Sequence, residues 1–166
     1  MKIKLCVTFL LFFTGILLVP GIHAQESITL GLSPEASAHT RAGVAVGGGL
    51  LVGLDINQQL AAGLKAAYYH NLDTVMTVEA QAFFRYTLPW PEGPGGPFVQ
   101  AELGSDLFFE NSELFPAISG GLSLGWSFVF AENWFVEPAG RFGYPYIWGA
   151  TLTAGYKFPL NKGSAK

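Results

Sequence analysis

Eight charged side chains stand at alternate positions within runs of residues that are otherwise mostly apolar or small. They are Lys65, Glu79, Arg85, Glu102, Asp106, Glu137, Arg141 and Lys157. A charge that is removed from water must be paired and hydrogen-bonded, so this set predicts a network of buried ion pairs. Such a network could close an interior as a salt-bridge plug, or it could form a narrow, charge-lined conduit or gate.

The spacing also suggests partners within this network. Arg85 and Glu102 fall at similar heights on either side of a turn near residues 88–97, so they could pair. Glu79 and Asp106 fall opposite one another across the same turn. Two like charges would need a cation between them, and Arg141 could reach across to supply it.

Patterns that would carry catalysis or bind a metal are weak. His39 lies near Ser37 and His70 lies near Asp73, but neither pair has the spacing of a nucleophile, a base and an orienting group. No cluster of His, Cys or carboxylates has metal-ligand spacing. The glycines at 47–49 are not followed by the Lys and Ser or Thr of a phosphate-binding loop. We therefore expect no enzyme activity and no cofactor.

The charges are positioned by segments with a two-residue period. In the segment 118–130, bulky apolar residues alternate with glycine and serine. Successive side chains of a strand point to opposite faces, so one face is bulky and apolar and the other is nearly bare. This alternation predicts eight strands, near residues 27–33, 42–55, 60–69, 75–88, 97–109, 117–130, 134–142 and 147–158. Turn signals separate them, at 34–41, 55–59, 70–74, 88–97, 110–116, 131–133 and 143–146.

Eight such strands could close into either of two barrels. A secreted soluble, lipocalin-like barrel would turn the apolar face inward around a hydrophobic ligand, whereas an outer-membrane barrel would turn it outward to lipid. An eight-stranded interior is just wide enough for side chains to fill, so it could not hold all the bulky apolar residues. The sequence therefore favours an all-β fold, an eight-stranded antiparallel up-and-down transmembrane β-barrel. Leu51 and Phe83 are exceptions, because both fall on the small, polar face.

Aromatic residues near the strand ends support this orientation, because membrane barrels carry aromatic girdles at both water interfaces. One predicted group comprises Tyr86, Trp90, Trp126, Phe128, Trp134, Tyr156 and Phe158. The other comprises Tyr68, Phe109, Phe115, Tyr144, Tyr146 and Trp148.

The N-terminus indicates export. Lys2 and Lys4 precede an apolar run, which a Pro-Gly pair and a small residue follow, as in a secretory signal peptide; an uncleaved anchor is the alternative. The predicted organisation is a cleaved signal peptide at 1–24, an outer-membrane barrel at 25–158 and a short C-terminal tail at 159–166. Cys6 is the only cysteine, so no disulfide framework is expected. Without Lys2 and Lys4, seven basic and twelve acidic residues remain, a net charge of −5 that does not suggest nucleic acid as a partner.

The C-terminal third carries a family resemblance. The segments "FVFAENWFVEPAGRFGYPY" and "LTAGYKF" resemble the small eight-stranded outer-membrane proteins of the OmpX, OmpW and opacity-protein kind. The resemblance implies that Gly155, Tyr156 and Phe158 act as a recognition signal for the barrel-assembly machinery. Some barrels of this size are lipid-modifying enzymes that use Ser and His, so the resemblance leaves such an enzyme as an alternative function.

These observations predict an integral outer-membrane protein with both termini in the periplasm. We expect outer-membrane lipids and the assembly machinery as partners, together with a small hydrophobic solute if the barrel conducts. A structural barrel and a narrow, porin-like channel for small or hydrophobic solutes both fit the sequence. A surface-interaction, adhesin-like barrel is a further alternative, which the short predicted connections weaken.

Overall fold

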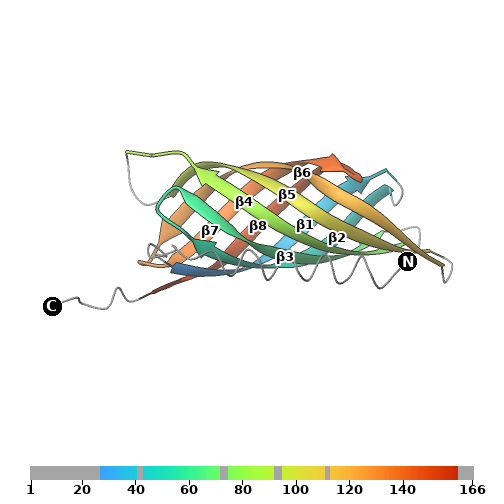
Figure 1. Ribbon diagram of the computed structural model, residues 1–166, viewed down its shortest axis with the longest axis horizontal. Coiled ribbons are helices and arrows are strands. Elements are labelled where there is room, and N and C mark those ends of the chain that lie inside the picture. Colours follow the sequence, from blue (N-terminus) through green and yellow to red (C-terminus); the bar gives the residue numbers. More distant parts are fainter. Residues whose placement is uncertain (1–26, 41–42, 72–74, 92–94, 111–112, 161–166) are drawn as a thin grey trace, which may run out of the picture.

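The strands close into a barrel with the predicted number and order of strands. The computed structural model describes residues 27–40, 43–71, 75–91, 95–110 and 113–160. In this part of the chain the strands are β1 (Ser27–His39), β2 (Gly43–Asp55), β3 (Leu60–Asn71), β4 (Met76–Thr87), β5 (Gly95–Glu110), β6 (Glu113–Phe130), β7 (Trp134–Tyr144) and β8 (Tyr146–Pro159). Each strand pairs antiparallel with the next, and β8 pairs with β1 (Figure 1). The predicted fold class is confirmed.

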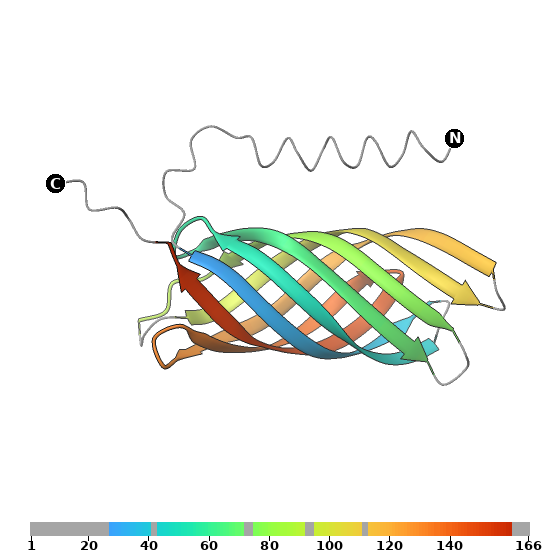
Figure 2. The same ribbon diagram turned by 90° about the horizontal axis from the view of Figure 1, so that it is seen from below.

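The two ends of the barrel are defined by the chain. Ser27, the first residue of β1, lies opposite Pro159, the last residue of β8, so both described ends of the chain meet at one end of the barrel (Figure 2). We call this the terminal end; β2 connects to β3 there, β4 to β5, and β6 to β7. At the other end, the distal end, β1 connects to β2, β3 to β4, β5 to β6, and β7 to β8. The predicted signal peptide at 1–24 lies outside the described residues, as does most of the predicted tail.

The main error in the predicted strands is in β1. The segment 34–41 is not a connection, because β1 continues through Pro34 to His39. Proline has no backbone N–H and cannot donate a hydrogen bond to a neighbouring strand. The pairing of β1 with β8 is interrupted at Ser33 and Pro34, which have no register partners on β8. The predicted connection 110–116 is also too long, since β5 ends at Glu110 and β6 begins at Glu113.

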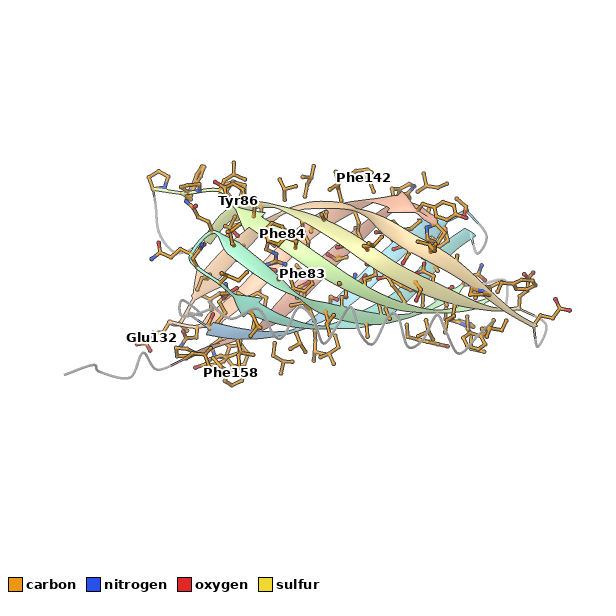
Figure 3. All side chains as sticks on the ribbon, viewed as in Figure 1. Phe83, Phe84, Tyr86, Glu132, Phe142 and Phe158 are labelled. Carbon is orange, nitrogen blue, oxygen red and sulfur yellow. The ribbon has the colours of Figure 1, made fainter. Side chains whose placement is uncertain are left out.

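The barrel is apolar outside and polar inside, as the alternation predicts. Leu32, Leu103, Ile118 and Leu152 are among the many large apolar side chains exposed on the outer wall. Phe142 and Phe158 project away from the wall in Figure 3. Of the eight charged residues predicted to point inward, seven are buried, Arg141 and Glu79 fully so, and Lys157 is partly exposed. A soluble lipocalin-like barrel would require the opposite arrangement.

Aromatic residues gather at the terminal end on the outer wall. Trp90 and Trp126 meet edge to face with their centroids 4.7 Å apart, and Tyr156 contacts both Trp134 and Phe158, at 5.3 and 4.8 Å. This group matches the predicted girdle.

Two members of the predicted distal girdle lie inside the barrel. Tyr146 is fully buried, because the pairing of β1 with β8 shifts register between Ala38 and His39 and so reverses the face of Tyr146. Phe115 packs against the buried Phe108. Tyr68, Phe109, Tyr144 and Trp148 are exposed at this end, as predicted.

Large inward side chains fill the space that the small residues leave. A Cβ on Gly125 would lie 2.6 Å from the Phe98 ring, and one on Gly155 would lie 2.6 Å from the Phe135 ring. Leu51 and Phe83, the two exceptions in the sequence pattern, are also buried inside. The bare inner face is therefore a set of recesses for bulky residues and does not widen the lumen.

None of the described segments is a helix with the length and apolar character that crossing a membrane requires.

Candidate functional site

The centre of the lumen is occupied by the guanidinium of Arg141, from β7. Its Nη2 donates hydrogen bonds to Glu79 Oε2 at 3.0 Å and to Glu102 Oε2 at 2.9 Å. Its Nη1 lies 3.2 Å from Glu35 Oε2. Arg141 is 0% exposed, so one cation from β7 joins carboxylates on β1, β4 and β5 without access to bulk water.

A second cation, Lys65 from β3, completes this cluster. Its Nζ donates to Glu35 Oε2 at 2.7 Å and lies 3.5 Å from Glu79 Oε1. The hydroxyl of Tyr69 donates to Glu35 Oε2 and accepts from Arg141 Nη1 at 2.6 Å. We refer to Arg141, Lys65, Glu35, Glu79 and Glu102 as the central cluster. Two cations face three carboxylates in it, and hydrogen bonds from neutral groups stabilise the remaining negative charge.

Neutral polar side chains fix the position of Glu102 in the central cluster. Its Oε1 accepts hydrogen bonds from Ser123 at 2.7 Å and from Gln100 at 2.8 Å. Its Oε2 accepts from the Tyr146 hydroxyl at 3.1 Å, in addition to Arg141. Four donors hold the Glu102 carboxylate in one orientation, in which it faces Arg141.

The predicted pair of Arg85 with Glu102 is wrong. Arg85 Nη1 instead donates to both oxygens of Glu137, each at 2.8 Å. Gln100 stands between Arg85 and Glu102, because it accepts from Arg85 Nε at 2.9 Å and donates to Glu102. The ring of Phe98 lies 4.2 Å from the Arg85 guanidinium. Strands β4 and β7 are far apart in the sheet, so this pair crosses the lumen.

The second predicted arrangement is found in part. Glu79 and Asp106 are register partners on β4 and β5, and Arg141 contacts Glu79 from across the barrel. Asp106, however, does not share this cation: both of its carboxylate oxygens are buried without a hydrogen bond among the described residues.

The distal half of the lumen is closed by aromatic rings. His39 makes edge contacts with Tyr69, Phe108 and Tyr146, with ring centroids 5.3 to 6.2 Å apart. All four residues are buried. Together with the central cluster they fill the interior from its middle to its distal end.

The terminal half is more open. A cavity of about 550 Å³ opens at the terminal end, and its wall includes the ion pair between Lys157 and Asp55, 3.1 Å apart. Arg85 and Glu137 also line this cavity. Deeper in the lumen there is a void of about 20 Å³, and its lining includes Arg85, Glu137, Lys65 and Glu102. That volume suffices for one water molecule.

Of the residues considered for catalysis, Ser37 and His39 make no hydrogen bond to each other, and Asp73, the predicted neighbour of His70, lies outside the described residues. Ser37 and His39 are both buried inside β1, and neither the Ser37 hydroxyl nor the His39 ring nitrogens have a hydrogen-bond partner in the described part of the chain. His70 is exposed near the distal end of β3. Within the described ranges, no group of three or more His, Cys, Asp or Glu could hold a metal ion.

The predicted assembly-signal residues lie at the terminal end of β8. Tyr156 and Phe158 belong to the outer aromatic group described above. Gly155 lies opposite Gly31 of β1 and Phe135 of β7, and the Phe135 ring occupies the space where its side chain would be. Their role as a signal remains a prediction.

The pair of Arg85 and Glu137 provides a test of the lumen geometry. Arg85→Glu and Glu137→Arg should each destabilise the barrel by about 3 kcal/mol, the lower end of the cost of a buried charge without its partner, because the cavity beside the pair gives the like charges some access to water. The double variant should recover most of that loss, because the charges are exchanged across the same contact. Urea unfolding of the refolded protein would measure all three. A double variant no more stable than the worse single one would contradict the pairing.

Several residues of the site were missed by the sequence analysis. Glu35 was placed in a connection because Pro34 was interpreted as a turn signal, although the polar residues Ser33, Glu35, Ser37 and His39 continue the two-residue period of β1. Tyr69 follows the same period in β3, opposite the outward Tyr68. For Tyr146 no signal in the sequence was available, because its orientation depends on the register shift.

Comparisons with known proteins support the fold. No family model matches the chain, and no curated protein matches it. Among solved structures, the chain is similar to Neisserial surface protein A (16% identity, TM-score 0.58), covering 81% of this chain and 96% of that one. It is also similar to the N-terminal β-barrel domain of OprF from Pseudomonas aeruginosa (19% identity, TM-score 0.57), covering 81% and 98%.

A third structure is Ail, the attachment invasion locus protein of Yersinia pestis, solved with the heparin analogue sucrose octasulfate. It is 15% identical with a TM-score of 0.52, covering 81% of this chain and 98% of that one. At these identities the likeness concerns the fold. The chain has the fold of the small eight-stranded outer-membrane barrels, which confirms the resemblance drawn from the sequence.

Proposed function

We propose that this protein is an integral outer-membrane barrel whose lumen is closed by the central cluster, so that it acts as a structural barrel without a steady pore. The observation that carries the proposal is the position of Arg141. A fully buried guanidinium bound to three carboxylates from three strands spans the interior. Water and solutes cannot pass while these contacts persist.

The outer wall supports residence in a membrane. Lipid provides no hydrogen-bond partners for backbone groups, and a closed barrel leaves no strand edge unpaired. The exposed apolar side chains and the aromatic group at the terminal end match the surface that outer-membrane lipids require. The predicted signal peptide and the assembly signal at Gly155, Tyr156 and Phe158 fit export and insertion by the barrel-assembly machinery. An even number of strands brings both termini to the same side of the membrane, and we propose that this side is the periplasm.

A narrow, gated channel is the second candidate. It is favoured by the open cavity and by the void of about 20 Å³ behind Arg85, which together bring solvent close to the central cluster from the terminal end. Opening would require the contacts of Arg141 to break. We do not propose an adhesin role, because the distal connections are short, with β5 ending at Glu110 and β6 beginning at Glu113. Nor do we propose a catalytic activity.

Refolding and reconstitution of the mature chain would test the proposal. We expect a heat-modifiable shift in gel mobility, which reports a closed barrel, and no steady porin-like current in planar bilayers. A steady current through the wild-type barrel would favour the channel. Recovery of the exported protein in the soluble periplasmic fraction would overturn the membrane assignment.

A further inference from the structure

Asp106 is the one residue in the predicted inward set of charges that lacks a partner. The other seven residues each take part in an ion pair, whereas Asp106 forms none within the described part of the chain. Asp106 is 0% exposed, and neither of its carboxylate oxygens has a hydrogen-bond partner among the described residues. Burial of this kind disfavours the ionised form of a carboxyl group and favours the neutral, protonated form.

The register partner of Asp106 on β4 is another buried acid, Glu79. Side chains that lie opposite each other in an antiparallel pair have Cβ atoms about 4.5–5.5 Å apart, so the two carboxyl groups are within reach of each other. Arg141 and Lys65 contact Glu79, at 3.0 and 3.5 Å, and neither cation forms an ion pair with Asp106. Two ionised carboxylates this close need a cation between them.

No other group in the described part of the lumen offsets a negative charge on Asp106. The two cations of the central cluster already face three carboxylates, and Arg85 binds Glu137. A cationic His39 would itself be unpaired, because its ring nitrogens have no hydrogen-bond partner among the described residues. A metal ion is not indicated either, since the described ranges contain no group of three or more His, Cys, Asp or Glu that could hold one. A proton is the remaining way to neutralise Asp106.

Titratable side chains from five other strands share this part of the interior with Asp106. They are Glu35 and His39 of β1, Lys65 and Tyr69 of β3, Glu79 of β4, Arg141 of β7 and Tyr146 of β8, and β5 itself adds Glu102. On the side of β6, the register partner of Asp106 is the neutral Ala117. Glu79 is therefore the acidic register neighbour of Asp106. Its Oε1 contacts the Tyr69 hydroxyl and Lys65 at 3.5 Å, so it can accept a further, shorter hydrogen bond.

We propose that Asp106 is protonated in the folded barrel at neutral pH and donates a hydrogen bond from its carboxyl O–H to the carboxylate of Glu79. Glu79 stays ionised, because Arg141 binds it, and the Asp106 carboxyl group gains the partner that it otherwise lacks. The two acids bind one proton as a unit, and that proton comes from water when the barrel folds. The pair is a proton-binding site beside the central cluster, and it makes the stability of the barrel depend on pH.

The sign of this dependence follows from the number of protons that each state binds. An aspartate in the unfolded chain has a pKa of about 4, so above about pH 5 the unfolded chain has released the proton that the folded barrel keeps. The unfolding equilibrium constant therefore rises with pH, by up to about tenfold per pH unit for one proton. The rise ends where the folded barrel also loses the proton.

Urea unfolding of the wild type and of Asp106→Asn from about pH 5 to pH 8 would measure this dependence. Asparagine is neutral and keeps an N–H donor for Glu79. We therefore expect the variant to lack the one-proton dependence and to be at least as stable as the wild type at the upper end of the range. The control is Asp55→Asn, the same change at an ion-paired aspartate, which should keep the wild-type dependence. Identical pH dependence of the wild type and Asp106→Asn would contradict the proposal.

Infrared spectroscopy of the wild type detects the proton directly and requires no variant to fold. The chain contains three aspartates, Asp55, Asp73 and Asp106, so carbon-13 labelling of aspartate leaves few candidates for a band. At neutral pH we expect the C=O stretch of a protonated carboxylic acid that shifts with this label, is absent from Asp106→Asn and persists in Asp55→Asn. A wild type without this band that sodium ions stabilise would contain a metal cation instead, which would overturn the proposal. A barrel that shows the heat-modifiable shift but no such band would overturn this inference and leave the membrane assignment standing.

Discussion

Replacing Arg141 with methionine is expected to destabilise the barrel by about 3–5 kcal/mol, the cost of leaving buried charges without their partner. Glu35, Glu79 and Glu102 would remain in the lumen, with Lys65 as their only cation in the central cluster. Urea unfolding in lipid vesicles, followed by tryptophan fluorescence, would measure the change. In planar bilayers the same variant should show at most brief, small openings, because the rings of His39, Tyr69, Phe108 and Tyr146 still close the distal half of the lumen.

Two further variants make this prediction specific. Lys157→Met removes a cation from a partly exposed ion pair at the terminal end, where the side chains of Lys157 and Asp55 are 27% and 15% exposed, and should cost about 1 kcal/mol or less. Replacing Glu79 and Glu102 by glutamine in the Arg141→Met background should restore most of the lost stability, because the two charges that remain in the central cluster, Lys65 and Glu35, form an ion pair. An Arg141→Met barrel as stable as the wild type would contradict the pairing of Arg141 with the three buried carboxylates.

Gly47→Ala is expected to cost about 3 kcal/mol, the upper end of the range for overpacking, or to prevent refolding. A Cβ at this position would overlap the backbone carbonyl of Tyr68 and would come within 2.8 Å of Tyr69 Cα. Gly47 stands between Glu35 and Tyr69 in one row of the sheet. Because Gly47 has no side chain, the Tyr69 ring can lie across β2, and its hydroxyl forms hydrogen bonds with Glu35 and Arg141.

The neighbouring glycine provides the matched control. Gly48 faces the outer wall, and the nearest atom to a Cβ there is the Ser33 carbonyl oxygen at 3.4 Å. Gly48→Ala should therefore refold with a stability within about 1 kcal/mol of the wild type, because alanine restricts the unfolded chain at no steric cost. Thermal unfolding of both variants in the same detergent would compare them. Equal stability of the two variants would contradict the close packing of β2 against β3.

The sequence predicted which residues face the interior, but it did not predict which of them pair with each other. Arg141, Glu79 and Glu102 were assigned to the interior correctly because a strand places alternate residues on one face, whatever the rest of the fold does. The pairing of Arg85 with Glu102 was inferred from neighbouring strands alone. It failed because Glu137, on β7, reaches Arg85 across the lumen, and contacts across a lumen have no signature in sequence spacing.

The sequence by itself therefore determined the number of strands, the apolar outer wall and the polar interior, since all three follow from a local two-residue period. Only the tertiary structure decided which inward charges meet, that Tyr146 and Phe115 fill the lumen, and that Glu35 joins the central cluster through a strand containing Pro34. Those outcomes depend on barrel closure, on the tilt and stagger of the strands, and on irregularities in the pairing of β1 with β8. These are properties of the closed sheet, and no single strand encodes them.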